Sequence, residues 1–130
     1  MTHVSLFRQR GLSMAYNILT TDEMDFLLNK SVSYLLNKFK SEQAAKHLLA
    51  GVSNIYDTLE DNPFLYRVSD DPYMKSMNYH EAKVKDMDYM VIYKVVDNDV
   101  YVLGIFHTLE KYSEKMRFTW NAFNPNRNDS

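Results

Sequence analysis

Two apolar runs separated by three polar residues dominate the second half of this chain. Residues 89–96 read YMVIYKVV and residues 100–107 read VYVLGIFH, with DND between them. Asp97 and Asn98 suit the tight turn of a β-hairpin. Both runs are apolar at successive positions, which is typical of strands that are covered on both faces. The hairpin is therefore expected at the centre of a sheet, with helices packed over it.

Two helices are predicted upstream of the hairpin, over residues 22–39 and 41–59. Thr20 and Glu23 have the spacing of a capping box at the first helix, and apolar residues recur there at helical intervals. A serine opens the second helix, and Pro63 ends it because proline forces the preceding residue out of helical geometry. Since so short a link joins them, the two helices are expected to fold back as an antiparallel pair.

Three further strands are predicted, over residues 15–21, 64–68 and 79–85, with a loop over residues 69–78. A final amphipathic helix is expected over residues 109–123. The predicted fold class is therefore α+β: an N-terminal strand, an antiparallel helical hairpin, an antiparallel meander of three or four strands, and a C-terminal amphipathic helix.

The length of 130 residues suits one domain that buries its own core. Residues 1–13 have no clear periodicity and precede Met14, so they are expected to be a flexible leader or a start-site extension. The domain itself is expected to span residues 14–123, and residues 124–130 to form a disordered tail.

Composition excludes several kinds of site. The chain has no cysteine, which rules out disulfides and thiolate metal ligands, and the four histidines lack metal-ligand spacing. Its 15 Lys and Arg face 17 Asp and Glu, so nucleic-acid binding would need a local basic patch. No apolar run approaches the ~18 residues of a membrane helix. We expect a cytoplasmic protein with no metal, cofactor or membrane partner.

Cations and a histidine on the predicted sheet are the candidate catalytic groups. Lys83 and Lys85 would share one strand face with Glu81, because side chains alternate along a strand. Basic residues among tyrosines can bind RNA through phosphate contacts and base stacking, although tyrosine is also a common strand residue. His107 ends the last strand, where it could be a general acid or base, or a structural or interface residue.

The tail has one apolar side and is the candidate surface for a protein partner. Leu109, Tyr112, Met116, Trp120 and Phe123 recur at helical spacing. This side is expected to dock on the sheet or to receive a partner.

The order of these elements resembles the RelE/ParE superfamily of bacterial toxins. Three patches carry the resemblance: LEDNP (59–63) with YRV (66–68), DYMVIYKV (88–95) and DNDVYVLGIFH (97–107). The resemblance spans about residues 15–112. It implies the toxin of a type II toxin–antitoxin pair, a plasmid stabilisation protein that inhibits growth and is neutralised by a cognate antitoxin.

The superfamily includes two functional classes. RelE-like members cut mRNA on the ribosome with a set of cations, which stabilise charge on the phosphate, whereas ParE-like members inhibit DNA gyrase by binding. Lys83 matches one strand lysine of the nuclease pattern, and Tyr112 stands near its C-terminal tyrosine. Glu81, Met90 and Glu110 stand where the pattern has a lysine and two arginines, and a carboxylate there would repel a phosphate.

The resemblance therefore favours a ParE-like toxin that acts by protein binding, with DNA gyrase as the target and no catalysis of its own. One alternative is a RelE-like ribosome-dependent endoribonuclease, for which the candidate residues are Lys83, Lys85, Arg67, His107 and Tyr112. A second alternative is an inactive relative that retains only antitoxin binding. The partners implied are a cognate antitoxin and either gyrase or the ribosome with mRNA, in a homodimer or a hetero-oligomer with the antitoxin.

Overall fold

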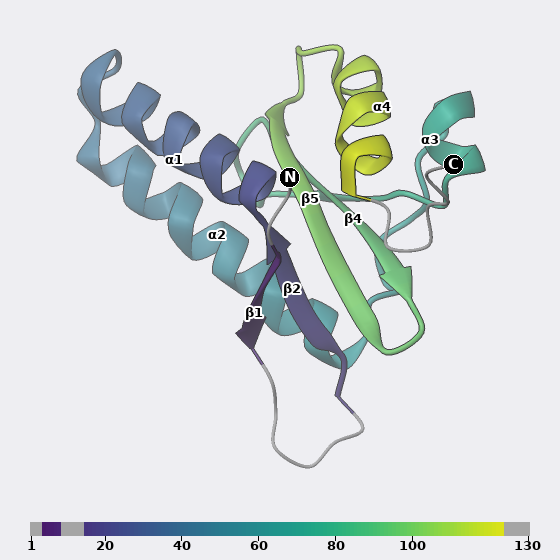
Figure 1. Ribbon diagram of the computed structural model, residues 1–130. Coiled ribbons are helices and arrows are strands. Elements are labelled where there is room, and N and C mark those ends of the chain that lie inside the picture. The colour runs from purple at the N-terminus through teal and green to yellow at the C-terminus, as the bar shows by residue number, and fades with distance from the viewer. Residues whose placement is uncertain (1–3, 9–14, 124–130) are drawn as a thin grey trace.

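The computed structural model describes residues 4–8 and 15–123, and for residues 4–8 and 118–123 it describes the backbone alone. The elements in chain order are β1 (Val4–Arg8), β2 (Asn17–Thr21), α1 (Asp22–Asn37), α2 (Glu42–Asp61), α3 (Pro72–Ser76), β3 (His80–Lys83), β4 (Tyr89–Val96), β5 (Asp99–His107) and α4 (Tyr112–Phe123). The α+β class and the order of strand, helical hairpin, meander and final helix are as predicted (Figure 1).

The sheet has the order β1-β2-β5-β4-β3, so the predicted hairpin of β4 and β5 is central. Antiparallel pairing joins β1 to β2, β5 to β4 and β4 to β3, whereas β2 and β5 are parallel. The chain path permits this parallel pair, because α1, α2, α3, β3 and β4 lie between β2 and β5 in sequence and provide the long connection that parallel strands need. In this register Tyr89 lies opposite His107, and Glu81 lies opposite Ile92.

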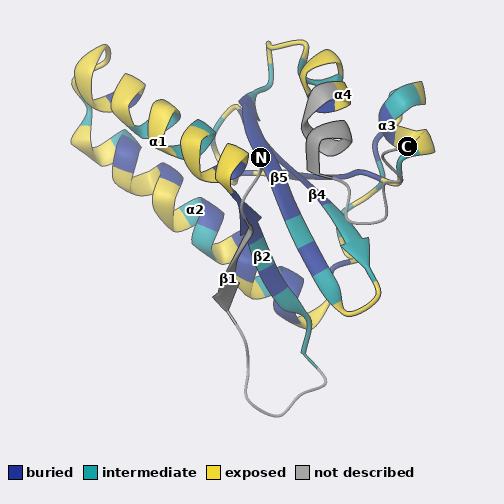
Figure 2. Cartoon of the chain, viewed as in Figure 1, coloured by how far each residue is buried: buried dark blue, intermediate teal, exposed yellow. Residues whose placement is uncertain are grey.

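Helices cover both faces of the sheet, which confirms the expectation from the two apolar runs (Figures 1 and 2). The first core lies between the α1–α2 hairpin and the sheet, and its fully buried members include Ile18, Met24, Leu48, Leu59 and Val91. The second core lies on the opposite face, towards α3 and α4. Its buried members are Met74, Tyr79, Ile92, Leu103, Phe106 and Met116.

Helix ends follow local hydrogen bonding. Ser41 caps α2 as expected, since its Oγ accepts from the Ala44 N–H at 3.0 Å. The cap of α1 is displaced by one residue from the prediction, because Thr21 Oγ1 accepts from the Met24 N–H at 3.1 Å. Thr20 is not available as the cap because it still pairs with β5.

Two predictions between α2 and β3 are wrong. Residues 64–68 form no strand: Val68 makes a single bridge to His80, and the segment before it turns around Asn62. The predicted loop over residues 69–78 contains α3, which begins where Asp71 caps Pro72–Ser76 and accepts from the Met74 N–H at 3.1 Å. A cap followed by proline is a local helix signal that hydrophobic periodicity misses.

Two terminal segments also differ from expectation. The stretch read as a leader contains β1, which extends the sheet by pairing with β2, while residues 1–3 and 9–14 lie outside the described residues. The expected tail at residues 124–130 also lies outside them. Helix α4 begins at Tyr112 because a turn precedes it, in which the Glu110 N–H donates to the His107 carbonyl at 2.9 Å.

Among the described helices, none is both long and apolar enough to span a membrane.

Candidate functional site

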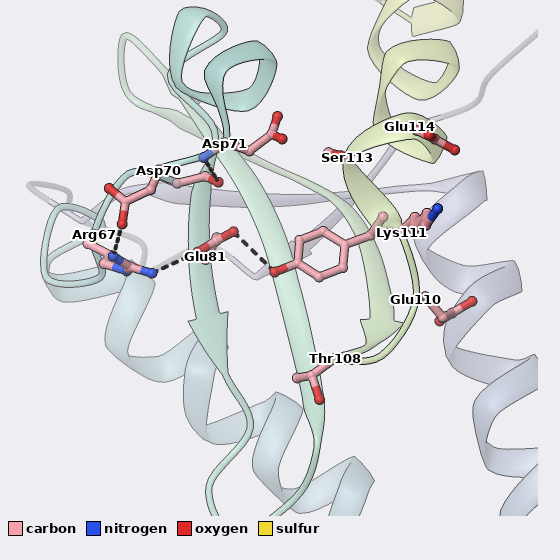
Figure 3. Close-up of a pocket in the computed structure, with 11 residues that line it drawn as sticks. Arg67, Asp70, Asp71, Glu81, Thr108, Glu110, Lys111, Ser113 and Glu114 are labelled. Carbon is pink, nitrogen blue, oxygen red and sulfur yellow. Dashed lines mark hydrogen bonds and ion pairs between the residues drawn. The ribbon is translucent and has the colours of Figure 1, made fainter.

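A shallow pocket of about 400 Å³ opens where β3 meets the start of α4 (Figure 3). Three of its residues form a chain of polar contacts. Glu81 Oε2 accepts from the Tyr112 hydroxyl at 3.2 Å, and Glu81 Oε1 lies 3.6 Å from Arg67 Nη2. Arg67 Nη1 in turn donates to Asp70 Oδ2 at 2.6 Å. The pocket lining is Arg67, Ser69, Asp70, Asp71, Glu81, Thr108, Glu110, Lys111, Tyr112, Ser113 and Glu114.

The sheet register places these side chains together. Glu81 lies opposite Ile92, a member of the second core, so its carboxylate points to the α4 face of the sheet. The Glu81 N–H also donates to the Arg67 carbonyl at 3.0 Å, which holds the Arg67 segment beside β3. Tyr112 reaches the same point from α4, and its ring stacks on Phe106 with centroids 5.8 Å apart.

The charged side chains that line this pocket are predominantly acidic. Glu81 is 8% exposed, so its carboxylate is largely removed from water. Its contacts with Tyr112 and Arg67 compensate for that loss of hydration. Burial, and then the charge of Glu81, raise the pKa of Tyr112, which keeps the phenol protonated as a donor. The hydrogen bond to Asp70 raises the already high pKa of Arg67. Five carboxyl groups line the pocket against Arg67 and Lys111, so it disfavours a phosphate.

The five candidate nuclease residues do not converge. Arg67 and Tyr112 share the pocket, but Lys83 points its Nζ to the Met87 carbonyl at 2.7 Å. Lys85 lies in the turn after β3, so the prediction that it shares a strand face with Lys83 is wrong. The Lys85 carbonyl accepts from His47 Nε2 at 3.1 Å, beside α2.

His107 faces the opposite side of the sheet from Arg67 and Tyr112. It lies across from Tyr89, which belongs to the first core, and the two rings meet edge to face with centroids 5.4 Å apart. Its Nδ1 accepts from the Leu109 N–H at 3.2 Å, so the neutral ring carries its proton on Nε2. Because side chains alternate along a strand, His107 lies on the α1 side of the sheet, away from Arg67 and Tyr112.

His107 lines the largest of the described concavities, a groove of about 1010 Å³. The groove lies between α1, the start of β4 and the end of β5. Tyr34 and Phe39, 49% and 62% exposed, stack edge to face on the α1 side with centroids 5.2 Å apart. Leu109 is 87% exposed at its end. Burial, and then the neighbouring Tyr34, raise the pKa of Tyr89 in the floor. Lysines and carboxylates rim the groove: Lys30, Lys38, Lys115, Asp86, Asp88 and Glu110.

Sequence reasoning missed the groove because it counts residues along one element at a time. Its walls come from α1, the turn before β4 and the turn after β5, which only the fold brings together. The available signal was Tyr34 and Phe39, which are large aromatic residues near the exposed end of a helix.

The predicted partner-binding set is divided by the fold. Met116 is fully buried in the second core and Tyr112 is half-buried over Phe106, so α4 docks on the sheet, one of the two fates expected for it. Leu109 precedes the helix and lies in the groove instead. The side chains of Trp120 and Phe123 lie outside the described residues.

No group of three or more His, Cys, Asp or Glu in the described part of the chain has the arrangement of a metal site.

Comparison with known proteins gives the family. A search of curated proteins finds no match. The family model of the ParE toxin of the type II toxin–antitoxin system parDE matches residues 27–112, well over half of the 130 residues. The match runs from α1 through the whole sheet region after it and ends at the first residue of α4. The chain therefore belongs to the ParE toxin family of type II toxin–antitoxin systems.

Proposed function

We propose that this chain is a cytoplasmic toxin that stops growth by binding DNA gyrase, and that a cognate antitoxin silences it by direct contact. The observation that carries the proposal is the dispersal of the candidate catalytic groups over both faces of the sheet. A toxin without a convergent cationic site must act through the surface it presents to another protein.

Cleavage of RNA by the usual route needs cations placed where charge develops on the phosphate. Arg67 is the one candidate cation in the pocket, and Asp70 and Glu81 already neutralise it. Glu81, which stands where the nuclease pattern has a lysine, thus has two effects. The pocket lacks that cation, and the carboxylate pairs with Arg67, the candidate cation that remains. Both effects disfavour an RNA backbone in this pocket.

The groove is better suited to a protein partner. It combines an apolar floor with exposed aromatic walls, and charges of both signs stand at its rim. Amphipathic helices bind such grooves through apolar residues spaced three and four apart. We propose that a helix of the antitoxin occupies it, flanked by the lysines and carboxylates of the rim, in a toxin–antitoxin hetero-oligomer.

The alternative endoribonuclease retains one supporting observation, the shared pocket of Arg67 and Tyr112. The test is to assay the purified chain for inhibition of gyrase supercoiling and, separately, for mRNA cleavage on translating ribosomes. The proposal expects supercoiling to be lost and mRNA to stay intact. Cleavage of mRNA without an effect on gyrase would contradict it.

Variants sharpen the same test. Lys83→Ala with His107→Ala should leave growth inhibition unchanged, because neither side chain lies with Arg67 and Tyr112. Loss of toxicity in a folded double variant would favour the nuclease. A chain that binds antitoxin but neither slows growth nor affects gyrase would be the inactive relative.

A further inference from the structure

Helix α4 lies beyond the part of the chain that the family model matches, apart from its first residue. It covers an apolar face of the sheet that would otherwise be open. Its Met116 is buried in the second core together with Ile92, Leu103 and Phe106 of the sheet, and Met74 of α3 belongs to the same core. This face is therefore a large apolar surface whose cover is supplied by the same chain.

Polar contacts fix this cover at its first turn. Glu81 of β3 accepts from Tyr112 of α4 at 3.2 Å and faces Arg67 at 3.6 Å, and we call these three residues the latch. Further along α4, Arg117 lies over the Tyr73 ring of α3 with its guanidinium carbon 4.9 Å from the centroid. A turn over residues 108–111 precedes the helix and is the natural hinge.

The burial of Glu81 explains why the latch stabilises the docked position of α4. While α4 is docked, the carboxylate is almost fully removed from water, and a buried charge is tolerated only when its oxygens are bonded. Tyr112 satisfies Oε2 in that state. If α4 left the sheet, water would satisfy the same oxygen. The hydroxyl of Tyr112 therefore offsets the dehydration that docking imposes on Glu81.

We propose that α4 is a hinged cover that the latch holds closed over the apolar face of the sheet. In this arrangement the closed state depends on the Tyr112 hydroxyl, because without it Oε2 is buried with no donor from α4. Removal of that hydroxyl should shift the equilibrium towards the open state by about tenfold, the size expected for a hydrogen bond to a charged group. The inference does not depend on the cellular target.

Hydrogen exchange of the full chain tests the proposal. In Tyr112→Phe, the amides of residues 113–123 should exchange about tenfold faster than in the wild type, whereas those of β4 and β5 should be unchanged. Binding of a hydrophobic dye should rise in parallel, because the apolar face becomes accessible. Tyr16→Phe is the matched control: Tyr16 is half-buried against the first core, on the other face of the sheet, and should leave α4 exchange unchanged.

A second variant identifies the acceptor. Glu81→Ala removes the acceptor altogether, so in that background Tyr112→Phe should change the exchange of residues 113–123 by less than twofold. Exchange of residues 113–123 within twofold of the wild type in Tyr112→Phe would overturn the proposal. Equal acceleration in β4 and β5 would also overturn it, since the hydroxyl would then stabilise the whole fold and not the cover.

Discussion

Gly51, in the middle of α2, lies against Val84, the residue that follows β3. A methyl group added at Gly51 would stand 2.5 Å from Val84 Cγ1, closer than any normal contact between carbon atoms. Val84 is fully buried, and its N–H donates to the Tyr89 carbonyl at 2.9 Å. Because valine also has restricted rotamers, its side chain cannot move aside without displacing this backbone.

The substitution Gly51→Ala tests this packing of α2 on the sheet. Alanine gains about 1 kcal/mol over glycine within a helix, whereas overpacking of a core costs about 1–3 kcal/mol. The severity of the contact with Val84 places the cost in the upper part of that range. We therefore expect Gly51→Ala to destabilise the protein by about 1–2 kcal/mol, measured by urea unfolding.

The background Val84→Ala provides the control, because it removes the methyl groups that obstruct position 51. In that background Gly51→Ala should become neutral or stabilising, by up to about 1 kcal/mol, as helix propensity alone predicts. Stabilisation of the otherwise unchanged protein by Gly51→Ala would refute the close packing of α2 on Val84. The same effect in both backgrounds would refute the assignment of the cost to this contact.

Three further predictions concern tyrosines. Tyr93→Phe removes the donor to the buried Pro63 carbonyl, 2.5 Å from the hydroxyl, and should cost about 1–2 kcal/mol in urea unfolding; no loss would refute this bond. Burial raises the pKa of Tyr79 and Tyr93 well above 10. Their contribution to the free energy of unfolding should therefore be fully present below pH ~10 and decrease above it, because these tyrosines ionise first in the unfolded chain. Melting temperatures that stay constant above that pH would contradict this. Tyr34→Ala should weaken antitoxin binding at least tenfold by calorimetry, whereas Leu36→Ala, exposed on α1 outside the groove, should not; equal effects would exclude the groove as the antitoxin site.

Local patterns were sufficient to predict most of the fold. The strand at residues 89–96 has the predicted bounds, and β5 and both long helices differ from theirs by at most two residues, because apolar periodicity and caps act within each element. The segment at residues 64–68 was misread, because a short apolar run after a helix reads like a strand. Its residues Phe64 and Leu65 are instead exposed in a turn. The parallel pairing of β2 with β5 is a property of the chain path, which no local pattern encodes.

The candidate site was harder to predict because it depends on strand parity and on docking of the tail. Sequence reasoning recognised that Glu81 disfavours a phosphate, but not that it bonds Tyr112, since that contact joins residues 31 positions apart in sequence. The alternation of side chains along β5 also determines the face of the sheet on which His107 lies. Its place opposite Tyr89 in the β4–β5 register puts it on the α1 side, away from Arg67.

Gyrase binding and RNA cleavage predict different first effects of this toxin on a growing cell. The most direct measurement is pulse-labelling of DNA, RNA and protein synthesis after the chain alone is induced in a bacterium. The proposed function predicts that DNA synthesis falls first, before translation is affected. A first fall in protein synthesis would contradict it and would assign the chain to mRNA cleavage on the ribosome, despite the carboxylate of Glu81 beside Arg67.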